Sequence, residues 1–277
     1  MRRAKRSQYK AAIIGLGRVA STLEDDPLRA KPCTHAGSYH QSQKIIMVAG
    51  SDRNEDKREN FKKRWNVKKA YEDYRVMLTK EKPDIVSITA YATERYQMFK
   101  DCITAGVKAI WLEKAVSTSL KQAKSMVRLA KKHQVITVVN HPRRWIRPYV
   151  AAKSLIDLGY IGKPESITTN FTSNLLHTGT HAFDMMRFFF GEAKRVRGTP
   201  DPYYKDYFKG VSGYDFEKDK EKYLLDIGGN GTIEFENGAI GSVNGRLKKY
   251  FLFEFEMIGT EGGIRIGNTT PLLWLKP

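Results

Sequence analysis

Cysteine and long apolar runs are scarce in this sequence of 277 residues. Its two cysteines, Cys33 and Cys102, imply no disulfide framework, and a reducing cytoplasm is the expected compartment. No apolar run approaches the ~20 residues that span a bilayer. The basic N-terminus leads into a short strand that glycines interrupt, which is not the pattern of a cleavable signal sequence. We therefore expect a cytoplasmic protein with no membrane partner.

Acidic residues are few relative to basic ones, since 48 Lys and Arg oppose 30 Asp and Glu and give a formal net charge of +18. One interpretation is a nucleic-acid surface. The other is a lysine-rich exterior around an enzyme that binds anionic ligands. The basic residues are spread along the chain, and no helix-turn-helix, zinc or RNA-binding signature accompanies them. We therefore expect no specific nucleic-acid partner.

The most informative segment is Ala11–Ala20, AAIIGLGRVA. A buried strand, a tight glycine turn and the start of a helix are expected here. Gly15 permits the sharp turn, Gly17 lets the backbone approach a pyrophosphate, and a small residue at position 20 allows close packing. The helix N-terminus would then offer N–H groups to the phosphates. The predicted cofactor-binding residues of this turn are Gly15, Leu16, Gly17, Arg18 and Val19.

The pattern of the chain changes near residue 140. Before it, short apolar strands alternate with amphipathic helices, as in a doubly wound parallel sheet. After it, strands dominate, and Glu236-Asn237-Gly238 signals a hairpin. We predict an α/β protein with a dinucleotide-binding Rossmann domain over 1–140. An α+β domain with a large, mostly antiparallel open sheet, for substrate binding and oligomerisation, follows over 141–277.

The predicted elements of the first domain are the strands Ala11–Ile14, Ile45–Ala49, Ile85–Thr89, Ala109–Leu112 and Val135–Val139 and the helices Thr93–Ala105 and Leu120–Lys132. Those of the second are the helices Tyr149–Leu158 and His181–Phe190 and the strands Glu165–Phe171, Arg195–Gly198, Gly231–Glu236, Ala239–Arg246 and Tyr250–Ile258, with a long loop over Pro200–Glu221. The apolar ending PLLWLKP either completes a sheet or marks a chain that stops short. The polar segment Thr22–His40 is either a surface excursion or part of an active-site rim.

Asp52 closes the second strand, where a carboxylate can accept hydrogen bonds from the ribose hydroxyls and favours NAD. Arg53 follows at once and could instead hold the 2′-phosphate of NADP. The cofactor is therefore predicted as NAD or NADP, with NAD preferred.

Two further groups of residues can carry proton transfer. Glu113-Lys114 follows the strand Ala109–Leu112, at the strand ends where open α/β sheets bind ligands. A lysine there can exchange a proton with a substrate hydroxyl as hydride moves. His177 and His181 lie four residues apart, and histidine titrates near neutral pH. A metal site is the rival interpretation of this pair, but no third ligand is evident and none is predicted.

Together these segments resemble the Gfo/Idh/MocA oxidoreductases, the family of glucose–fructose oxidoreductase and inositol dehydrogenase. The matching segments, in order, are GLGRVA, SDRN, EDYRVML, PDIVSIT, AGVKAIWLEK, NHPRRW, LGYIGKPESI, GTHAFDMMRFFFG and IGTEGGIRI. The resemblance implies hydride transfer between NAD(P) and a sugar, cyclitol or related carbonyl compound. It also implies a homo-oligomer, dimer or tetramer, through the C-terminal sheet. The alternative is a non-catalytic NAD(P)-binding regulator or interaction protein on the same scaffold.

The resemblance assigns roles to individual residues. Lys114 matches the lysine of the Glu-Lys-Pro motif, and His181 matches the catalytic histidine, with His177 assisting. Arg144 and Trp145 match a basic–aromatic pair at the domain junction, and these five residues form the predicted substrate site. The remaining predicted cofactor contacts are Thr89, Ala90, Tyr91, Glu113 and Lys114.

Five positions depart from the family pattern. The proline after the lysine is Ala115, the usual Thr-Pro segment reads Ala90-Tyr91, and a frequent histidine beyond it is Arg95. The family often has an aspartate four residues before the catalytic histidine, where this chain has His177. A carboxylate–lysine–histidine trio is thus expected to become a His–Lys–His trio.

Overall fold

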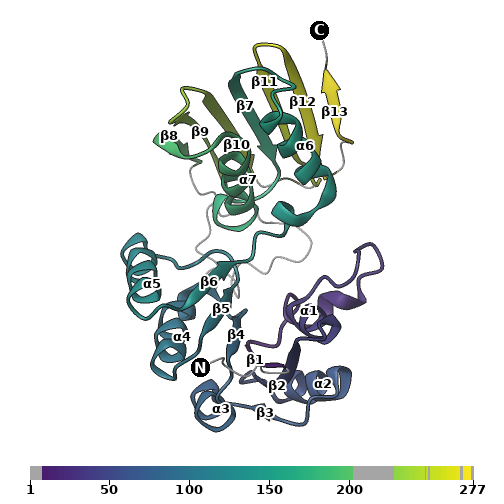
Figure 1. Cartoon of the computed structure of the whole chain (residues 1–277), viewed down its shortest axis with the longest axis vertical. Helices are drawn as coiled ribbons and strands as arrows, with labels where there is room; N and C mark the ends of the chain where they lie inside the picture. The colour runs from purple at the N-terminus through teal and green to yellow at the C-terminus, as the bar shows by residue number, and fades with distance from the viewer. Residues whose placement is uncertain (1–7, 202–227, 247, 249, 269–270, 276–277) are drawn as a thin grey trace, which may run out of the picture. The chain divides into compact units, whose positions relative to one another are not determined.

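The computed structural model describes residues 8–201, 228–246, 248, 250–268 and 271–275. The chain divides into two compact units, Met1–Asn140 and His141–Pro277, and each unit is described by itself (Figure 1). The predicted loop Pro200–Glu221 falls almost entirely outside the described residues. Within the described ranges, every helix is too short or too polar to cross a bilayer.

The first unit is built on a six-stranded sheet in which all pairs are parallel. Its strands are β1 (Tyr9–Ile14), β2 (Ile45–Ser51), β3 (Ala70–Tyr71), β4 (Ile85–Ile88), β5 (Ala109–Leu112) and β6 (Ile136–Val139). They lie in the order β3-β2-β1-β4-β5-β6. The strand order therefore reverses between β1 and β4, and ligands of doubly wound sheets bind at the carboxyl ends of strands at such a switch point.

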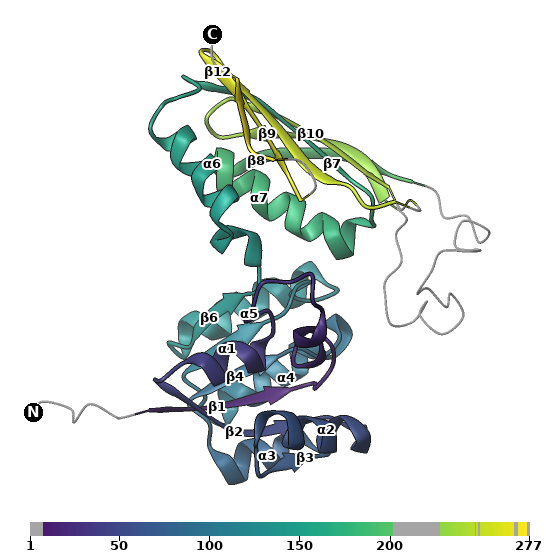
Figure 2. The ribbon, with the colours of Figure 1, turned by 90° about the vertical axis from the view of Figure 1, so that its right-hand side faces the viewer.

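Helices cover both faces of this sheet (Figure 2). They are α1 (His35–Gln41), α2 (Glu55–Trp65), α3 (Tyr74–Glu81), α4 (Ala92–Thr104) and α5 (Leu120–Lys132). On one face, Ala11 and Ile13 of β1 pack with Tyr39 of α1 and Phe61 of α2. On the other face, alternate strand residues such as Ile88 pack with residues of α3, α4 and α5. Because side chains alternate along a strand, burial of both faces explains why these strands are apolar throughout.

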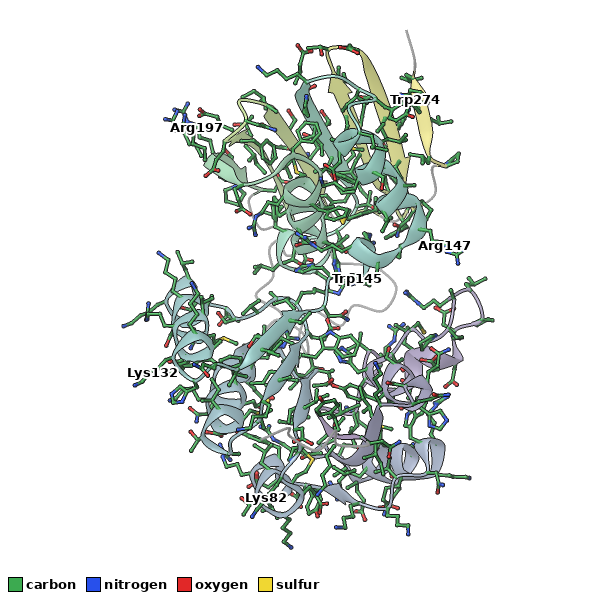
Figure 3. The ribbon with its side chains drawn as sticks, viewed as in Figure 1. Lys82, Lys132, Trp145, Arg147, Arg197 and Trp274 are labelled. Atoms are coloured by element: carbon green, nitrogen blue, oxygen red, sulfur yellow. The ribbon has the colours of Figure 1, made fainter. Side chains whose placement is uncertain are left out.

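The second unit is built on a seven-stranded sheet, β13-β12-β11-β7-β10-β9-β8. Its strands are β7 (Pro164–Phe171), β8 (Ala193–Pro200), β9 (Gly228–Phe235), β10 (Ile240–Arg246), β11 (Phe253–Gly259), β12 (Gly262–Gly267) and β13 (Leu273–Leu275). Among the described strands of this second sheet, only the β7–β10 pair is parallel. Arg197 on β8 and Trp274 on β13 mark the two edges of the sheet (Figure 3).

Helices α6 (Arg147–Asp157) and α7 (Thr180–Phe190) lie on one face of this sheet (Figure 2). A short 3₁₀ helix, Pro142–Trp145, precedes α6, and a turn of π-helix, Leu175–Gly179, precedes α7. Phe253, Phe255 and Phe171 point from the strands into the core that the two helices cover. The alternate residues of the strands, such as Asn244 and Glu256, are exposed on the other face, so this face is mostly polar, with Ile240 and Ile258 also exposed on it.

The structure confirms the predicted fold class, a parallel doubly wound sheet followed by a mostly antiparallel sheet. With the exception of the helix predicted after the glycine turn, each predicted strand and helix is present, with ends that differ by at most a few residues. The helix Leu120–Lys132 has the predicted bounds, because Ser119 caps it by accepting the Gln122 N–H. The apolar residues Leu273–Leu275 pair with β12 and so add an edge strand to the sheet.

The prediction of a helix directly after the glycine turn is wrong. The Ser21 N–H donates to the Gly17 carbonyl, at 3.0 Å, and closes a single turn. A 3₁₀ helix, Thr22–Asp25, follows, and α1 begins only at His35. Asp26 precedes Pro27, and its backbone is extended, with ψ 111°. A residue before proline is restricted in this way, and proline has no N–H to continue a helix, so the helix cannot continue past residue 25.

Removing the buried ring of Phe255 should destabilise the second unit. Phe255 is fully buried and stacks edge-on against Phe189 and Phe253, at centroid distances of 5.7 and 5.2 Å. We expect Phe255→Ala to lower the free energy of unfolding by about 3–5 kcal/mol, measured by urea unfolding. Phe251 is 55% exposed, and Phe251→Ala should change it by less than about 0.5 kcal/mol. Equal losses in the two variants would contradict this picture of the core.

Candidate active site

The glycine turn brings the ends of β1 and β4 together. Gly15 has φ +87°, and a Cβ there would lie 2.9 Å from the Ala90 nitrogen. Only glycine allows both that conformation and that close approach. The Thr89 hydroxyl donates to the Ile14 carbonyl, at 3.1 Å, and to the Gly15 carbonyl. The predicted cofactor residues Gly15, Thr89 and Ala90 are therefore brought into one cluster at the switch point.

Beyond Gly15 the turn exposes backbone donors. A Cβ on Gly17 would have no atom within 4 Å, so the space above it is open. In the described part of the chain, the N–H groups of Gly17, Arg18 and Val19 have no protein acceptor. Consecutive N–H groups that face an open space form an anion-binding site. The turn therefore fits a pyrophosphate even though only one turn of helix follows it.

Asp52 is held against the same turn. Its carboxylate accepts the Leu16 N–H at 2.8 Å and the Asn54 N–H at 3.0 Å, and its side chain is 14% exposed. Arg53 points outward, is 80% exposed and pairs with Glu94. Tyr91, at the start of α4, is also exposed. The structure thus places Asp52 beside the glycine turn and leaves Arg53 and Tyr91 at the outer edge of the cluster.

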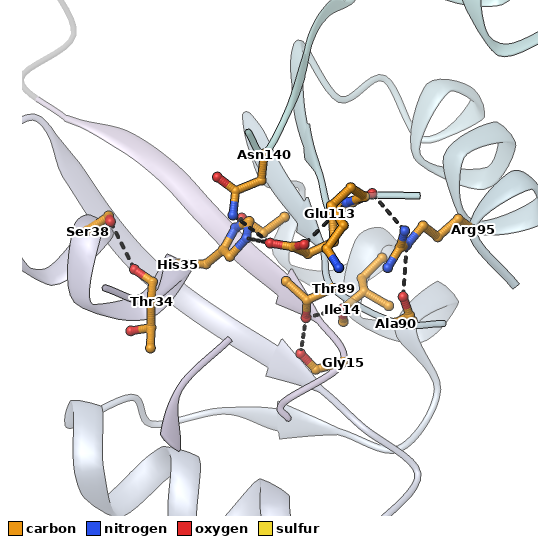
Figure 4. A network of polar contacts seen from close by, with 12 residues as sticks. Ile14, Gly15, Thr34, His35, Ser38, Thr89, Ala90, Arg95, Glu113 and Asn140 are labelled. Carbon is orange, nitrogen blue, oxygen red and sulfur yellow. Dashed lines mark hydrogen bonds and ion pairs between the residues drawn. The ribbon is translucent and has the colours of Figure 1, made fainter. Parts of the chain in front are cut away.

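The buried carboxylate of Glu113 is the centre of a polar network (Figure 4). One of its oxygens lies 3.2 Å from Nε2 of His35 and 2.5 Å from Nδ2 of Asn140. The other oxygen accepts the Lys114 N–H at 3.2 Å. Glu113 is 4% exposed and His35 is 1% exposed. The network therefore connects the backbone of Lys114 to α1 and to the residue after β6.

The network continues from His35 into the core. Nδ1 of His35 lies 2.9 Å from the Ser87 hydroxyl, which lies 2.7 Å from the Tyr39 hydroxyl. Burial raises the pKa of Tyr39 to about 12, so this hydroxyl stays protonated. An ionised carboxylate only accepts, so Nε2 of His35 donates to Glu113. The Ser87 hydroxyl therefore links the Tyr39 hydroxyl to Nδ1 of His35 within the core.

The same contacts decide the charge of Glu113. Burial raises its pKa, but the hydrogen bonds and charges of His35, Asn140 and Lys114 outweigh burial and hold the pKa below its ordinary value of 4.5. Glu113 is therefore ionised at neutral pH. It supplies a negative charge at the residue before Lys114.

In the second unit, His181 lies in the first turn of α7 and meets a second histidine. Its Nδ1 is 3.3 Å from Nδ1 of His141, and the two rings are perpendicular. His141 lies 3.9 Å from Asp184, whose carboxylate accepts from Arg144 at 2.8 and 2.9 Å. Two facing Nδ1 atoms can share only one proton between them. The arrangement can therefore hold a proton at one histidine and pass it to the other.

The other predicted substrate residues of this unit are placed separately. His177 lies in the π-helical turn, 3.2 Å from the Thr178 hydroxyl. The Arg144 guanidinium is bound by Asp184 and lies 5.1 Å from the Phe188 ring. Trp145 is 79% exposed (Figure 3). Arg144 is thus held by the protein itself, whereas the Trp145 ring is accessible.

Sequence reasoning missed His35, Ser87, Asn140 and His141. His35 lies in the polar segment that was predicted as a surface excursion or an active-site rim. Its position just after Thr34, a helix cap, was an available signal for a helix but not for a buried contact. Within the described ranges, no group of three or more His, Cys, Asp or Glu side chains could hold a metal ion.

Comparison with known proteins covers both units. Residues 9–141 match the family model "Oxidoreductase family, NAD-binding Rossmann fold", and residues 173–265 match the model "GFO/IDH/MocA C-terminal domain". Myo-inositol 2-dehydrogenase of Thermotoga maritima is 24% identical, over 94% of this chain and 75% of that protein. Scyllo-inositol 2-dehydrogenase (NAD(+)) of Bacillus subtilis is 26% identical, over 94% of this chain and 74% of that protein.

Solved structures share the fold. A WlbA dehydrogenase from Chromobacterium violaceum, in complex with NADH and UDP-GlcNAcA, superposes with a TM-score of 0.78 and 16% identity, over 99% of this chain and 79% of that one. A putative NADPH-dependent oxidoreductase from Desulfitobacterium hafniense has a TM-score of 0.76 and 23% identity, over 95% of this chain and 73% of that one.

The Glu113 network makes a pH-dependent contribution to stability. We expect Glu113→Gln to lower the free energy of unfolding at neutral pH by about 1.5–3 kcal/mol, because it removes a charged acceptor from buried donors. The folded-state pKa is depressed, so this advantage of the wild type is full above pH 4.5 and declines as the pH falls further. Urea unfolding over a pH series measures it. The exposed Glu72→Gln serves as the control, and a difference that is independent of pH would contradict the assignment.

The close approach at Gly15 predicts a specific loss of dinucleotide binding. Gly15 and Gly106 both have positive φ, +87° and +79°, but a Cβ on Gly106 meets no atom within 4 Å. We expect Gly15→Ala to weaken NADH binding by about tenfold or more, because its Cβ forces the ends of β1 and β4 apart. Gly106→Ala carries similar backbone strain without the clash and should bind NADH normally. Fluorescence titration measures both, and equal affinities would show that the close approach is unimportant.

Proposed function

The chain belongs to the Gfo/Idh/MocA family of oxidoreductases, and from that premise we propose that it transfers a hydride between the nicotinamide of NAD(P) and a hydroxyl or carbonyl carbon of a sugar, cyclitol or sugar derivative. The observation that carries the proposal is the anion site of Gly17, Arg18 and Val19, next to Asp52 at the β1–β4 switch point. Relatives named as inositol dehydrogenases and as a D-glucoside 3-dehydrogenase support the substrate class.

The cofactor would be held by the residues of the first unit. The N–H groups of the glycine turn would bind the pyrophosphate, and the Asp52 carboxylate would accept from the ribose hydroxyls. This carboxylate supports NAD as the preferred cofactor, although Arg53 beside it could hold the 2′-phosphate of NADP. Thr89, Ala90, Tyr91, Glu113 and Lys114 complete the proposed cofactor site. When bound, the nicotinamide accepts or gives the hydride.

Lys114 and His181 would exchange the proton of the reacting hydroxyl. When an alcohol is oxidised, its O–H proton must leave as the C–H hydride leaves, so a base must lie at that oxygen. Lys114 would orient the oxygen and exchange the proton. His181, with His141 at 3.3 Å, would store or relay it, and His177 would assist. Glu113, ionised and adjacent to Lys114, would supply a negative charge near its amine.

The second unit is proposed to bind the substrate and to assemble the oligomer. Arg144 and Trp145 are the proposed substrate contacts, along with the histidines. The open polar face of the sheet supports a homo-oligomer, dimer or tetramer, in which a second copy covers it. The cytoplasm is the proposed compartment, and the free thiols of Cys33 and Cys102 are compatible with it.

A non-catalytic NAD(P)-binding regulator is the second candidate, and the substitutions at Ala115 and His177 favour it. Both candidates predict NADH or NADPH binding. Only the first predicts turnover when inositols, free sugars and nucleotide sugars are offered with each cofactor. Dinucleotide binding without turnover across such a panel would support the regulator, and absence of binding would overturn both.

Removal of the Lys114 amine should separate chemistry from binding. We expect Lys114→Ala to lower kcat by about 10²- to 10⁴-fold, the usual effect of a positioned acid–base group. The affinity for NADH should stay within about threefold, because the pyrophosphate and ribose contacts are elsewhere. Steady-state kinetics and NADH titration measure the two effects. Lys108→Ala, an exposed lysine before β5, is the control, and full activity of the Lys114 variant would remove Lys114 from the mechanism.

A further inference from the structure

A buried arginine lies behind the two strand ends that carry the proposed active site. Arg95 is in the first turns of α4 and is 5% exposed. Among the residues that the structure describes, no carboxylate lies within ion-pair distance of its guanidinium. Burial lowers its pKa to about 10, so it is still a cation at neutral pH. A buried cation without an ion-pair partner is costly unless hydrogen bonds compensate it.

Three main-chain carbonyls compensate this charge, together with the nearby negative charge of Glu113. Figure 4 shows Arg95 with Ala90. Nε donates to the Ala90 carbonyl at 2.8 Å. Nη1 donates to the Glu113 carbonyl at 2.7 Å and also to the Ala115 carbonyl. Two of these acceptors belong to the residues immediately before and after Lys114. The third belongs to the segment that packs against Gly15.

Hydrogen bonds therefore hold the backbone of Lys114 and of the residues on both sides of it. Arg95 holds the carbonyl groups on both sides of it, and the Glu113 carboxylate accepts its N–H. Position 115 is alanine, which has none of the φ restraint of a proline ring, so the segment depends on these hydrogen bonds. The same guanidinium ties this segment to Ala90 at the end of β4. One side chain thus connects the Lys114 backbone to the cofactor turn.

We propose that Arg95 is a positioning residue for hydride transfer, which sets the Lys114 backbone relative to the glycine turn. The inference rests on the proposed function for the part that concerns turnover. The fork of the guanidinium is essential to it, because the donors are rigidly spaced and reach separate acceptors. A lysine ammonium keeps the charge but is a single point at the end of a flexible chain. It can therefore bind only some of the three carbonyls that Arg95 binds.

The test compares Arg95→Met, which removes the donors, and Arg95→Lys, which keeps the charge. We expect Arg95→Met to lower kcat by about 10²-fold, since a displacement of about 1 Å at a reacting group has this effect. NADH affinity should change by less than about threefold, and Arg95→Lys should recover part of kcat. Arg75→Met is the matched control, because Arg75 is 58% exposed and its ion pairs among the described residues are with Asp73 and Asp101, away from Lys114. It should leave kcat and NADH affinity unchanged.

A readout that does not need turnover keeps the inference independent of the proposed function. Amide hydrogen exchange over residues 113–117 should be faster in Arg95→Met than in the wild type, with exchange over β2 unchanged. If the wild type binds NADH but turns nothing over, the proposed function fails, and the exchange data still test the tie to Lys114. Unchanged exchange and kcat in Arg95→Met would overturn the inference. So would parallel loss of kcat, NADH affinity and thermal stability in both Arg95 variants, which would mark Arg95 as structural only.

Discussion

The buried carboxylate of Glu113 is the interaction on which the first unit depends. It accepts hydrogen bonds from α1, from the residue after β6 and from the backbone of Lys114. A carboxylate in this position is stable only because every donor points at it. The helix α1 is short, and two sets of contacts fix its place on the sheet. His35 contacts Glu113, and the N–H groups of His35 and Ala36 donate to the Val19 and Ala20 carbonyls at the end of the glycine turn.

Several departures from the family pattern become one arrangement in the folded chain. The aspartate that would precede the catalytic histidine is His177, while an ionised carboxylate lies next to Lys114 at Glu113. The proline after the lysine is Ala115, while Arg95, at a position where histidine is frequent, binds the carbonyl of Ala115. Considered alone, the substitution at position 177 removes a negative charge, and the substitution at position 115 removes a backbone restraint. In the structure, Arg95 restrains the backbone where the proline is missing, whereas no described contact replaces the aspartate missing at position 177.

Much of the fold could be predicted because short-range physics decides it. Runs of Ile and Val that are buried on both faces form parallel strands, and Asn237-Gly238 forms a tight connection between β9 and β10. The helix after the glycine turn was the exception. Pro27 prevents that helix from continuing, and a later helix, α1, covers this face of the sheet instead. Propensity places helices but does not say which one will pack.

The sequence by itself determined the two sheet types, the glycine turn and the chemical identity of Asp52, Lys114 and His181, because periodicity and glycine conformation are local properties. Only the tertiary structure decided that His35 contacts Glu113, 78 positions away, that Arg95 spans Ala90 and Ala115, and that His141 faces His181. Hydrogen bonds between distant residues leave no periodic trace in a sequence. They depend on which strand ends meet, and the strand order of the sheet sets that.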